Sequence, residues 1–459
     1  MSGSSKYTYV FPDIGSVLEK GKLFRIDHIT GKKSAPNVAI LDRQLLMRTA
    51  SDNVSALIAD LCDLAVAVYV ADRQSVRTNN HTARILITLP IRSAKLRERA
   101  SLNQELQDLL YWFTEDLWSF QLSTYEKSGR PSEYTPRLPL PQEEHQTQVA
   151  LWSGGLDALA GLYHQLVQEP DTHYTLLGTG SNNIMLGQQK KVFDKMGEIF
   201  RGRLKLIQIP IRLKKNNTQT VSSSRARGFV FLLLGAICAL QEKQQILYVY
   251  ENGTGAINLP FRECEVGLDH SRSVHPLSLM RMSNFLSKIL DQPFSFENPF
   301  MFTTKAEMCQ RLLQENPKIA FCTISCDSLH RSSPPQCGYC SSCLLRRQAI
   351  AVSGIEDQTL YQITASKERK QQKTDSAHLR AMLAQVDTLR KVQKSSDVWN
   401  SMVRLYPILQ EIVEKDTMIV SEEQGKQEII KQRLLHLYHE YVTEWDQVSA
   451  MIMRQGLQF

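Results

Sequence analysis

The chain has 459 residues and a formal net charge of +7, with 42% hydrophobic and 22% charged residues. This ordinary globular composition provides for a sizeable core, and the length predicts two or three domains. The longest apolar run, residues 228–240, is too short to span a membrane, and the first 30 residues hold no apolar stretch typical of a secretory signal. Nine cysteines without such a signal favour the reducing cytoplasm. The positive charge suits an anionic partner such as ATP or RNA, although the sequence contains no RNA-binding motif.

Residues 1–127 are predicted to form a mixed α/β domain with a scaffold or partner-binding role. Apolar residues recur at helical spacing over 54–68 and again over 102–117, and residues 83–89 form an apolar run that we expect to be a strand ending at Pro90. Four prolines between residues 128 and 144 then indicate a stiff linker.

Residues 145–355 alternate short apolar strands with helical stretches, which predicts an α/β fold with a doubly wound parallel sheet. The expected strands are 149–152, 174–177, 204–209, 246–250 and 319–323. Residues 356–459 are charged and helical in pattern, with a clear amphipathic helix over 430–448.

The segment Ser153-Gly154-Gly155-Leu156-Asp157 lies between the first of these strands and a helix. Two glycines allow a tight turn and a close ligand approach, and the following helix directs unpaired N–H groups toward the turn. Ser153 adds a hydroxyl, so the segment predicts an oxyanion cradle. It lacks the Gly-Lys-Ser/Thr ending of nucleotide-hydrolase loops, and a Gly-Gly turn without a ligand is the alternative.

Four cysteines are clustered at Cys326, Cys337, Cys340 and Cys343. Four thiolates complete the tetrahedral coordination of Zn²⁺, and two-residue gaps present successive sulfurs to one ion. We therefore predict a structural zinc site that has no open position for substrate. An iron–sulfur cluster and unmetallated thiols are the alternatives, although the downstream Cys-Pro of bacterial ferredoxins is missing.

The glycine loop resembles that of the N-type ATP pyrophosphatases, of the adenine-nucleotide alpha-hydrolase fold, although Ala158 replaces their usual serine. The Cys-Gly-x-Cys-x-x-Cys-x-Leu-Arg segment and Thr304-Lys305-Ala306-Glu307 resemble the 7-cyano-7-deazaguanine synthase family, QueC. The resemblance implies that a 7-deazaguanine-type carboxylate is adenylated by Mg-ATP, with loss of pyrophosphate, and then transferred to an amine. It implies ATP, Mg²⁺ and Zn²⁺ as cofactors. Residues 153–157 would then hold phosphate and Mg²⁺, and Lys305 would meet a phosphate or the substrate carboxylate. The remaining candidates for cofactor contacts are Arg225, Arg227 and Asn252.

The flanks, residues 1–127 and 356–459, resemble those of longer QueC-like proteins from bacterial anti-phage operons, such as QatC and the QueC-like protein of type IV CBASS. The resemblance implies other proteins of the same operon as partners, and Trp112, Trp118, Trp399 and Trp445 are aromatic candidates for such an interface. The alternatives are a catalytically degenerate nucleotide- or deazapurine-binding module and an adenylating tRNA-modification enzyme.

Overall fold

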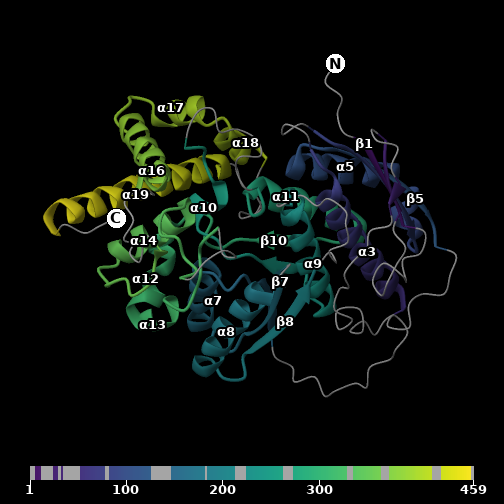
Figure 1. Cartoon of the computed structure of the whole chain (residues 1–459), viewed down its shortest axis with the longest axis horizontal. Coiled ribbons are helices and arrows are strands. Elements are labelled where there is room, and N and C mark those ends of the chain that lie inside the picture. Colours follow the sequence, from purple (N-terminus) through teal and green to yellow (C-terminus); the bar gives the residue numbers. More distant parts are fainter. Residues whose placement is uncertain are drawn as a thin grey trace.

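The structure is a computed structural model of the whole chain. It describes residues 6–11, 24–28, 33–34, 52–77, 82–125, 146–180, 183–211, 224–261, 272–327, 334–362, 372–415 and 425–455. Within these residues, two five-stranded sheets lie beside a group of C-terminal helices (Figure 1). The predicted proline-rich linker, 128–144, lies outside the described residues.

The first sheet is mixed and has the strand order β3-β2-β1-β4-β5. Strand β1 runs antiparallel to β2 and parallel to β4, and β4 runs parallel to β5. Helices α3 and α5 pack against this sheet. The elements are β1 (Lys6–Val10), β2 (Phe24–Asp27), β3 (Lys33–Ser34), α3 (Asp52–Gln74), β4 (Arg84–Ile91), α4 (Ala94–Glu98), α5 (Ala100–Thr114) and β5 (Leu117–Thr124).

The second sheet is parallel throughout and has the order β10-β9-β6-β7-β8. Its strands are β6 (Thr147–Leu151), β7 (His173–Gly180), β8 (Leu204–Pro210), β9 (Ile246–Tyr248) and β10 (Ser295–Glu297). Its larger helices are α7 (Leu156–Gln168), α8 (Asn183–Ile199), α9 (Arg227–Gln241), α11 (Pro276–Leu290), α12 (Lys305–Glu315) and α14 (Ser341–Val352). The shorter ones are α10 (Gly253–Ile257) and α13 (Pro317–Ala320).

Helices cover both faces of the second sheet, as its strand pattern requires. Val149 and Leu177 join a core with α9 and α11, whereas Ala150 and Leu176 join a core with α7, α8 and α12. Successive strand residues point to opposite faces, so a parallel sheet buried on both sides has apolar residues at consecutive positions. This arrangement confirms the predicted α/β fold with a parallel sheet.

The C-terminal part is helical, as predicted, and packs against α10 and α14. It consists of α16 (Gln372–Val392), α17 (Val398–Leu405), α18 (Ile408–Glu414) and α19 (Lys426–Gln455). Figure 1 shows these helices and the N-terminal sheet toward opposite ends of the molecule.

The N-terminal sheet and the central sheet share one hydrophobic core. Helix α3 lies against α9, and one cluster of buried residues includes both Tyr7 of the N-terminal sheet and Phe296 of the central sheet. A buried ion network adds to this contact: Arg77 binds both Asp72 and Asp116, and Asp72 accepts a hydrogen bond of 2.5 Å from Ser224. The two parts are therefore joined by packing and by buried charge.

Several predicted elements differ from the structure. Residues 319–323 are not a strand: Pro317 begins the short helix α13, whose Ile319 and Ala320 are buried, and β10 is the fifth strand instead. A short apolar run does not distinguish a strand from a buried helical turn. The helix predicted over 102–117 ends at Thr114, because Glu115 adopts a left-handed conformation (φ 55°). Strand β4 continues past Pro90, where it pairs with β5 but no longer with β1, so the missing N–H costs no ladder bond.

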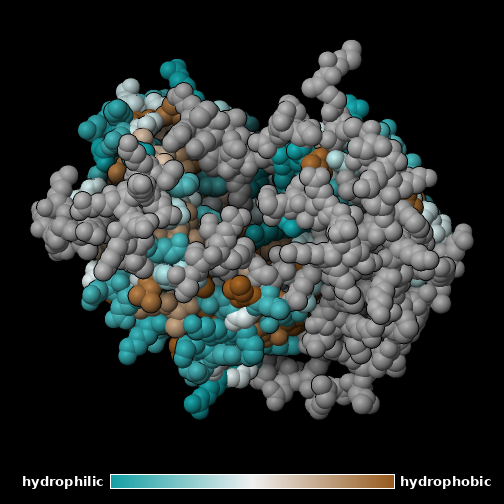
Figure 2. All heavy atoms as spheres, in the orientation of Figure 1, coloured by the Kyte–Doolittle hydropathy of each residue, from teal (hydrophilic) through white to brown (hydrophobic). Residues whose placement is uncertain are grey.

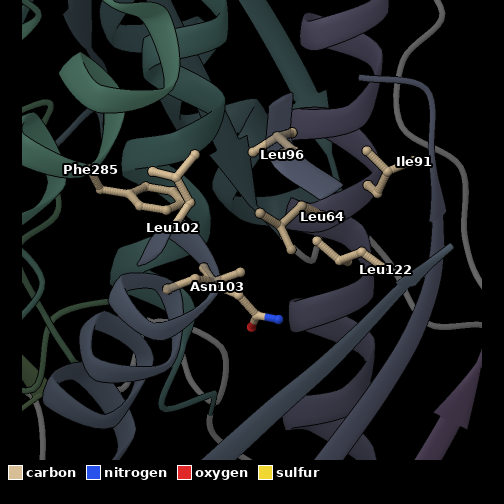
Figure 3. A pocket seen from close by; sticks show the side chains of 8 residues that line it. Leu64, Ile91, Leu96, Leu102, Asn103, Leu122 and Phe285 are labelled. Atoms are coloured by element: carbon tan, nitrogen blue, oxygen red, sulfur yellow. The ribbon is translucent and has the colours of Figure 1, made fainter. Parts of the chain in front are cut away.

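A small apolar cavity lies between α3, β4, α5, β5 and α11 (Figure 3). Its volume of about 10 Å³ holds at most one water molecule, so it is a packing gap and too small for a ligand. Its lining residues include Leu64, Leu102 and Phe285, and none of them is a predicted site residue. Among the described helices, none combines the length and the apolar character that a membrane span requires.

Candidate active site

The candidate site lies where the parallel sheet changes direction. From β6 the chain proceeds to β7 and β8 on one side, and then returns to place β9 on the other side of β6. In doubly wound folds, ligands bind at this switch point, outside the carboxyl ends of the strands. The loop after β6 contains residues 152–155, and the segment after β9 contains Glu251 and Asn252.

The glycine loop has the conformation that its sequence predicts. Gly154 lies at φ +71°, in the left-handed region, and a Cβ at this position would lie 2.9 Å from the Cα of Gln189 in α8. Ser153 is exposed, and its Oγ accepts a hydrogen bond of 3.2 Å from the amide of Gly155. Gly155 is the N-cap of α7, so the amides of the first turn, from the buried Leu156 onward, have no acceptor within the helix. The loop can therefore present several N–H donors and one hydroxyl to an anion.

Asp157, in the first turn of α7, is at the centre of a charged cluster. It forms an ion pair with Lys305, the first residue of α12, whose side chain is almost fully buried. Its Oδ1 accepts a hydrogen bond of 2.9 Å from Asn252 Nδ2, and the same nitrogen donates to Glu251 Oε1 at 2.8 Å. Three segments far apart in the sequence thus meet beside the glycine loop.

The electrostatics of this cluster follow from burial and mutual contact. Burial, together with the charge of Asp157, raises the pKa of Glu251 to about 8. Burial alone would lower the pKa of Lys305, but the carboxylates of Asp157 and Glu251 raise it overall. Lys305 therefore carries its positive charge at neutral pH, and Glu251 holds a proton over part of the physiological range.

Asn252 has a second role at the start of α10. Its Oδ1 caps this helix by accepting hydrogen bonds from the Gly255 amide at 2.8 Å and the Thr254 hydroxyl at 2.6 Å. The amide group is therefore fixed in orientation, with its nitrogen directed at the two carboxylates. The prediction that Asn252 lies at the ligand-binding edge agrees with this position, whereas a direct ligand contact stays a prediction.

Two predicted cofactor-binding residues are bound elsewhere. Arg225 donates a hydrogen bond of 3.3 Å to the carbonyl of Thr114 and lies 3.7 Å from Asp116, both in the N-terminal part of the chain. Arg227 stacks on Phe231, one turn along α9, with its Cζ 5.2 Å from the ring centroid. These contacts give both arginines a structural role, and their part in ligand binding stays a prediction.

The four clustered cysteines come together as the spacing predicts. Cys326, Cys337, Cys340 and Cys343 are all buried, and their sulfur atoms lie within 4.8 Å of one another. The Cys337 and Cys343 sulfurs are 3.9 Å apart, whereas sulfurs bound to one zinc at about 2.3 Å lie about 3.8 Å apart. The amides of Cys340 and Tyr339 donate to the Cys337 sulfur at 3.3 and 3.4 Å, which stabilises a thiolate. The geometry fits a single tetrahedral ion.

The cysteine site is connected to the glycine loop through the segment that precedes Cys326. A Cβ on Gly155 would lie 3.6 Å from the carbonyl of Ile324, and Gln188 donates a hydrogen bond of 2.6 Å to the carbonyl of Cys322. Arg346, fully buried in α14, holds the same segment through a bond of 2.6 Å to the Thr323 hydroxyl. A metal at the cysteines would therefore fix one wall of the loop.

Two acidic residues were not predicted from the sequence. Glu251 could have been predicted from its place in the sequence, because a carboxylate directly after a parallel strand lies at the ligand-binding edge of the sheet. Glu444, in α19, is buried and accepts hydrogen bonds from Thr304 and from Gln348, the latter at 2.7 Å. Nothing near Glu444 in the sequence indicates these contacts.

Comparison with known proteins shows that part of the chain is similar to a known family. The family model described as queuosine biosynthesis protein QueC matches residues 212–354, which is less than half of the chain. The matched range includes Asn252, Lys305 and the four cysteines, and the glycine loop lies before it. No match was found among the curated proteins. The match supports a QueC-like family and, with it, an ATP-utilising, nucleobase-modifying enzyme of the queuosine-pathway type.

Proposed function

We propose that the protein adenylates the carboxylate of a 7-deazaguanine-type nucleobase with ATP, releases pyrophosphate, and transfers the activated group to an amine. One observation carries this proposal: the glycine loop, Asp157 and Lys305 lie together at the switch point of a parallel sheet. A loop of N–H donors suits phosphate, and a buried ammonium group suits a second anionic group beside it.

The reaction follows two balanced steps. A carboxylate oxygen of the nucleobase attacks the α-phosphorus of ATP, the bond between this phosphorus and the bridging oxygen breaks, and pyrophosphate leaves with the electron pair. An amine nitrogen then attacks the activated carbonyl carbon and loses a proton, and AMP leaves. In the first step, negative charge grows on the departing pyrophosphate, where the Ser153 hydroxyl and the amides at the start of α7 would donate hydrogen bonds.

The carboxylates fit the magnesium ion that the resemblance implies. Asp157 and Glu251 share one amide nitrogen of Asn252, so their oxygens converge on a small region, and oxygen ligands of this kind are what Mg²⁺ prefers. A bound Mg²⁺ would neutralise phosphate charge. Lys305, fixed by Asp157, would orient an anionic group of either substrate at the same edge.

The proposal is tested by following pyrophosphate and AMP. Incubation of the full-length protein with Mg-ATP and a carboxylated deazaguanine should release both. Asp157→Asn and Lys305→Met should each reduce the rate at least a hundredfold, because each removes one half of the buried pair. Lys190→Met, which removes an exposed lysine paired with Asp194 in α8, is the matched control and should retain full activity.

Release of ADP and orthophosphate would contradict the proposed reaction. Ligand binding without any turnover would favour the degenerate binding module. One observation supports that alternative: position 158, a serine in the resembling loops, is a buried alanine in α7 and offers no hydroxyl.

We also propose a cytoplasmic location, on the nine cysteines, and a role in an anti-phage operon, on the resemblance of the flanks. The tryptophans considered for a partner interface give this little support, because Trp118 and Trp445 are buried in the cores and Trp112 and Trp399 pack against them. Exposed large hydrophobic residues among the described ones are scattered over several elements. On the face drawn in Figure 2, the hydrophobic colour forms small separate patches. A partner amine, such as a lysine or an N-terminus of another protein, would be detected by mass spectrometry of copurified proteins.

A further inference from the structure

Helix α19 contacts residues next to the candidate active site although it lies outside the QueC match. Figure 1 shows it lying across α10 and α14, in agreement with the contacts between these elements. Its buried face supplies Glu444 to the start of α12 and Leu437 to the start of α10. Helices α10 and α12 begin directly after Asn252 and Thr304, so both contacts are made next to the charged cluster.

The contact at α12 is specific. Thr304 caps the helix: its Oγ accepts the Glu307 amide at 3.1 Å, and its own amide donates to the Glu307 carboxylate at 2.7 Å. The Thr304 hydroxyl donates a hydrogen bond to Glu444 Oε1, and Gln348 Nε2 donates one to Glu444 Oε2. Glu444 thereby fixes the rotamer of the residue that precedes Lys305.

The contact at α10 is equally close. The Gly253 amide donates a hydrogen bond of 2.7 Å to the carbonyl of Thr303, so the beginnings of α10 and α12 are tied together. A Cβ on Gly253 would lie 2.8 Å from a methyl carbon of Leu437, which leaves no space between α10 and α19. Movement of α19 would therefore displace Asn252 and Lys305 together.

A buried carboxyl group at this position costs free energy that packing alone would not require. Glu444 is only 5% exposed, and its two hydrogen-bond donors are neutral. Burial of a carboxyl among neutral groups costs free energy that an apolar residue would not cost. The neighbouring Tyr441, Val442 and Trp445 already belong to the core between the C-terminal helices.

We propose that Glu444 is a positioning residue, which acts through Thr304 to hold Lys305 against Asp157, and that α19 thereby completes the active site. This inference rests on the proposed function in one respect: activity is expected to depend on the position of Lys305. The physical coupling between α19 and α12 does not depend on what the site binds.

The test uses the full-length protein with three substitutions in α19. Glu444→Ala removes both acceptors, and we expect at least a tenfold loss in kcat for pyrophosphate release. Glu444→Gln retains the shape, can accept from Thr304, and can donate to a rotated Gln348 amide, so we expect it to keep at least half of the activity. Asp446→Asn is the matched control, because it removes an exposed carboxylate that pairs with Arg390 and does not reach α12.

Hydrogen–deuterium exchange measures the coupling independently of catalysis. Glu444→Ala should increase exchange of the amides at residues 305–309, whereas Glu444→Gln and Asp446→Asn should leave it unchanged. If the alanine variant does not fold, Glu444→Asp replaces it, because the shorter side chain cannot reach Thr304 and Gln348 together.

The outcomes separate the two proposals. Unchanged exchange at residues 305–309 in a folded alanine or aspartate variant would overturn the positioning role, as would unchanged turnover. If the wild-type protein releases no pyrophosphate, the proposed reaction is wrong, and the exchange data alone then decide whether α19 fixes α12.

Discussion

Gly154 is the residue of the glycine loop whose replacement has the most clearly defined cost. Its φ of +71° lies in the left-handed region, and an added Cβ would lie 2.9 Å from the Cα and 3.2 Å from the amide nitrogen of Gln189. Both neighbouring atoms belong to the backbone of α8, so no change of side-chain rotamer relieves the contact. Gly154→Ala must therefore shift the loop or the helix.

Two other glycines separate the contributions to this cost. Gly202 also lies at positive φ (+76°), but a Cβ there has no neighbour within 4 Å, so Gly202→Ala should cost only about 1 kcal/mol for the backbone conformation. Gly197, in the interior of α8, also has no neighbour within 4 Å, and its replacement should stabilise the helix by about 1 kcal/mol. Gly154→Ala should cost about 2–4 kcal/mol, because overpacking adds 1–3 kcal/mol to the conformational penalty.

Urea unfolding of the three variants measures these differences, and pyrophosphate release measures the consequence for the loop. We expect Gly154→Ala to lose at least a hundredfold in turnover, because a shift of about 1 Å misplaces the donors at the start of α7. Gly202→Ala and Gly197→Ala should keep wild-type turnover. If Gly154→Ala costs no more than Gly202→Ala and retains full turnover, the proposed loop geometry is wrong.

Two further predictions concern the cysteine site and the buried Glu444. Elemental analysis should find one zinc per chain, and iron in the wild type would contradict the assignment. Cys340→Ser should lose the metal and melt at a lower temperature. The control Cys322→Ser, outside the cluster, should keep the metal and the wild-type melting temperature. Burial raises the pKa of Glu444 from about 4.5 to about 7, so the folded state retains a proton that the unfolded state loses above pH 4.5. The free energy of unfolding should therefore fall as pH rises from 4.5 to 7, by about 3 kcal/mol from this group, and Glu444→Gln should remove that slope in urea unfolding at pH 5 and pH 8. An identical slope in both proteins would show that Glu444 is not buried as a neutral acid.

The features that were predictable from the sequence are those whose cause is local. The glycine loop depends on a strand, two glycines and a helix in succession, and the structure has β6, Gly154, Gly155 and α7 in that order. The cysteine cluster depends on short spacing within residues 337–343, with Cys326 joining from the preceding segment. In both cases the residues that determine the geometry are close together in the chain.

The contacts that complete the site could not be predicted, because they join residues more than 90 positions apart. Asn252 is 95 positions from Asp157, Lys305 is 148 positions from it, and Glu444 is 140 positions from Thr304. Hydrophobic periodicity predicts which face of a helix is buried but not which element covers it. For the same reason, the tryptophans of the flanks were candidates for an interface in the sequence and are packed against internal cores in the structure.

The packing also bears on how the flanks contribute to function. One core runs from the N-terminal sheet into α9 and α11, and a second joins α10 and α14 to the C-terminal helices. Trp112 of α5 connects all three parts: its ring lies 4.5 Å from the guanidinium carbons of both Arg272 and Arg281, and Arg281 donates to Glu411 in α18 at 3.4 Å. A chain cut at residues 145 and 355 would expose apolar surface from both cores. The C-terminal helices therefore pack against α10 and contact the residue that precedes α12, whereas the N-terminal sheet supports the central sheet through α9 and α11.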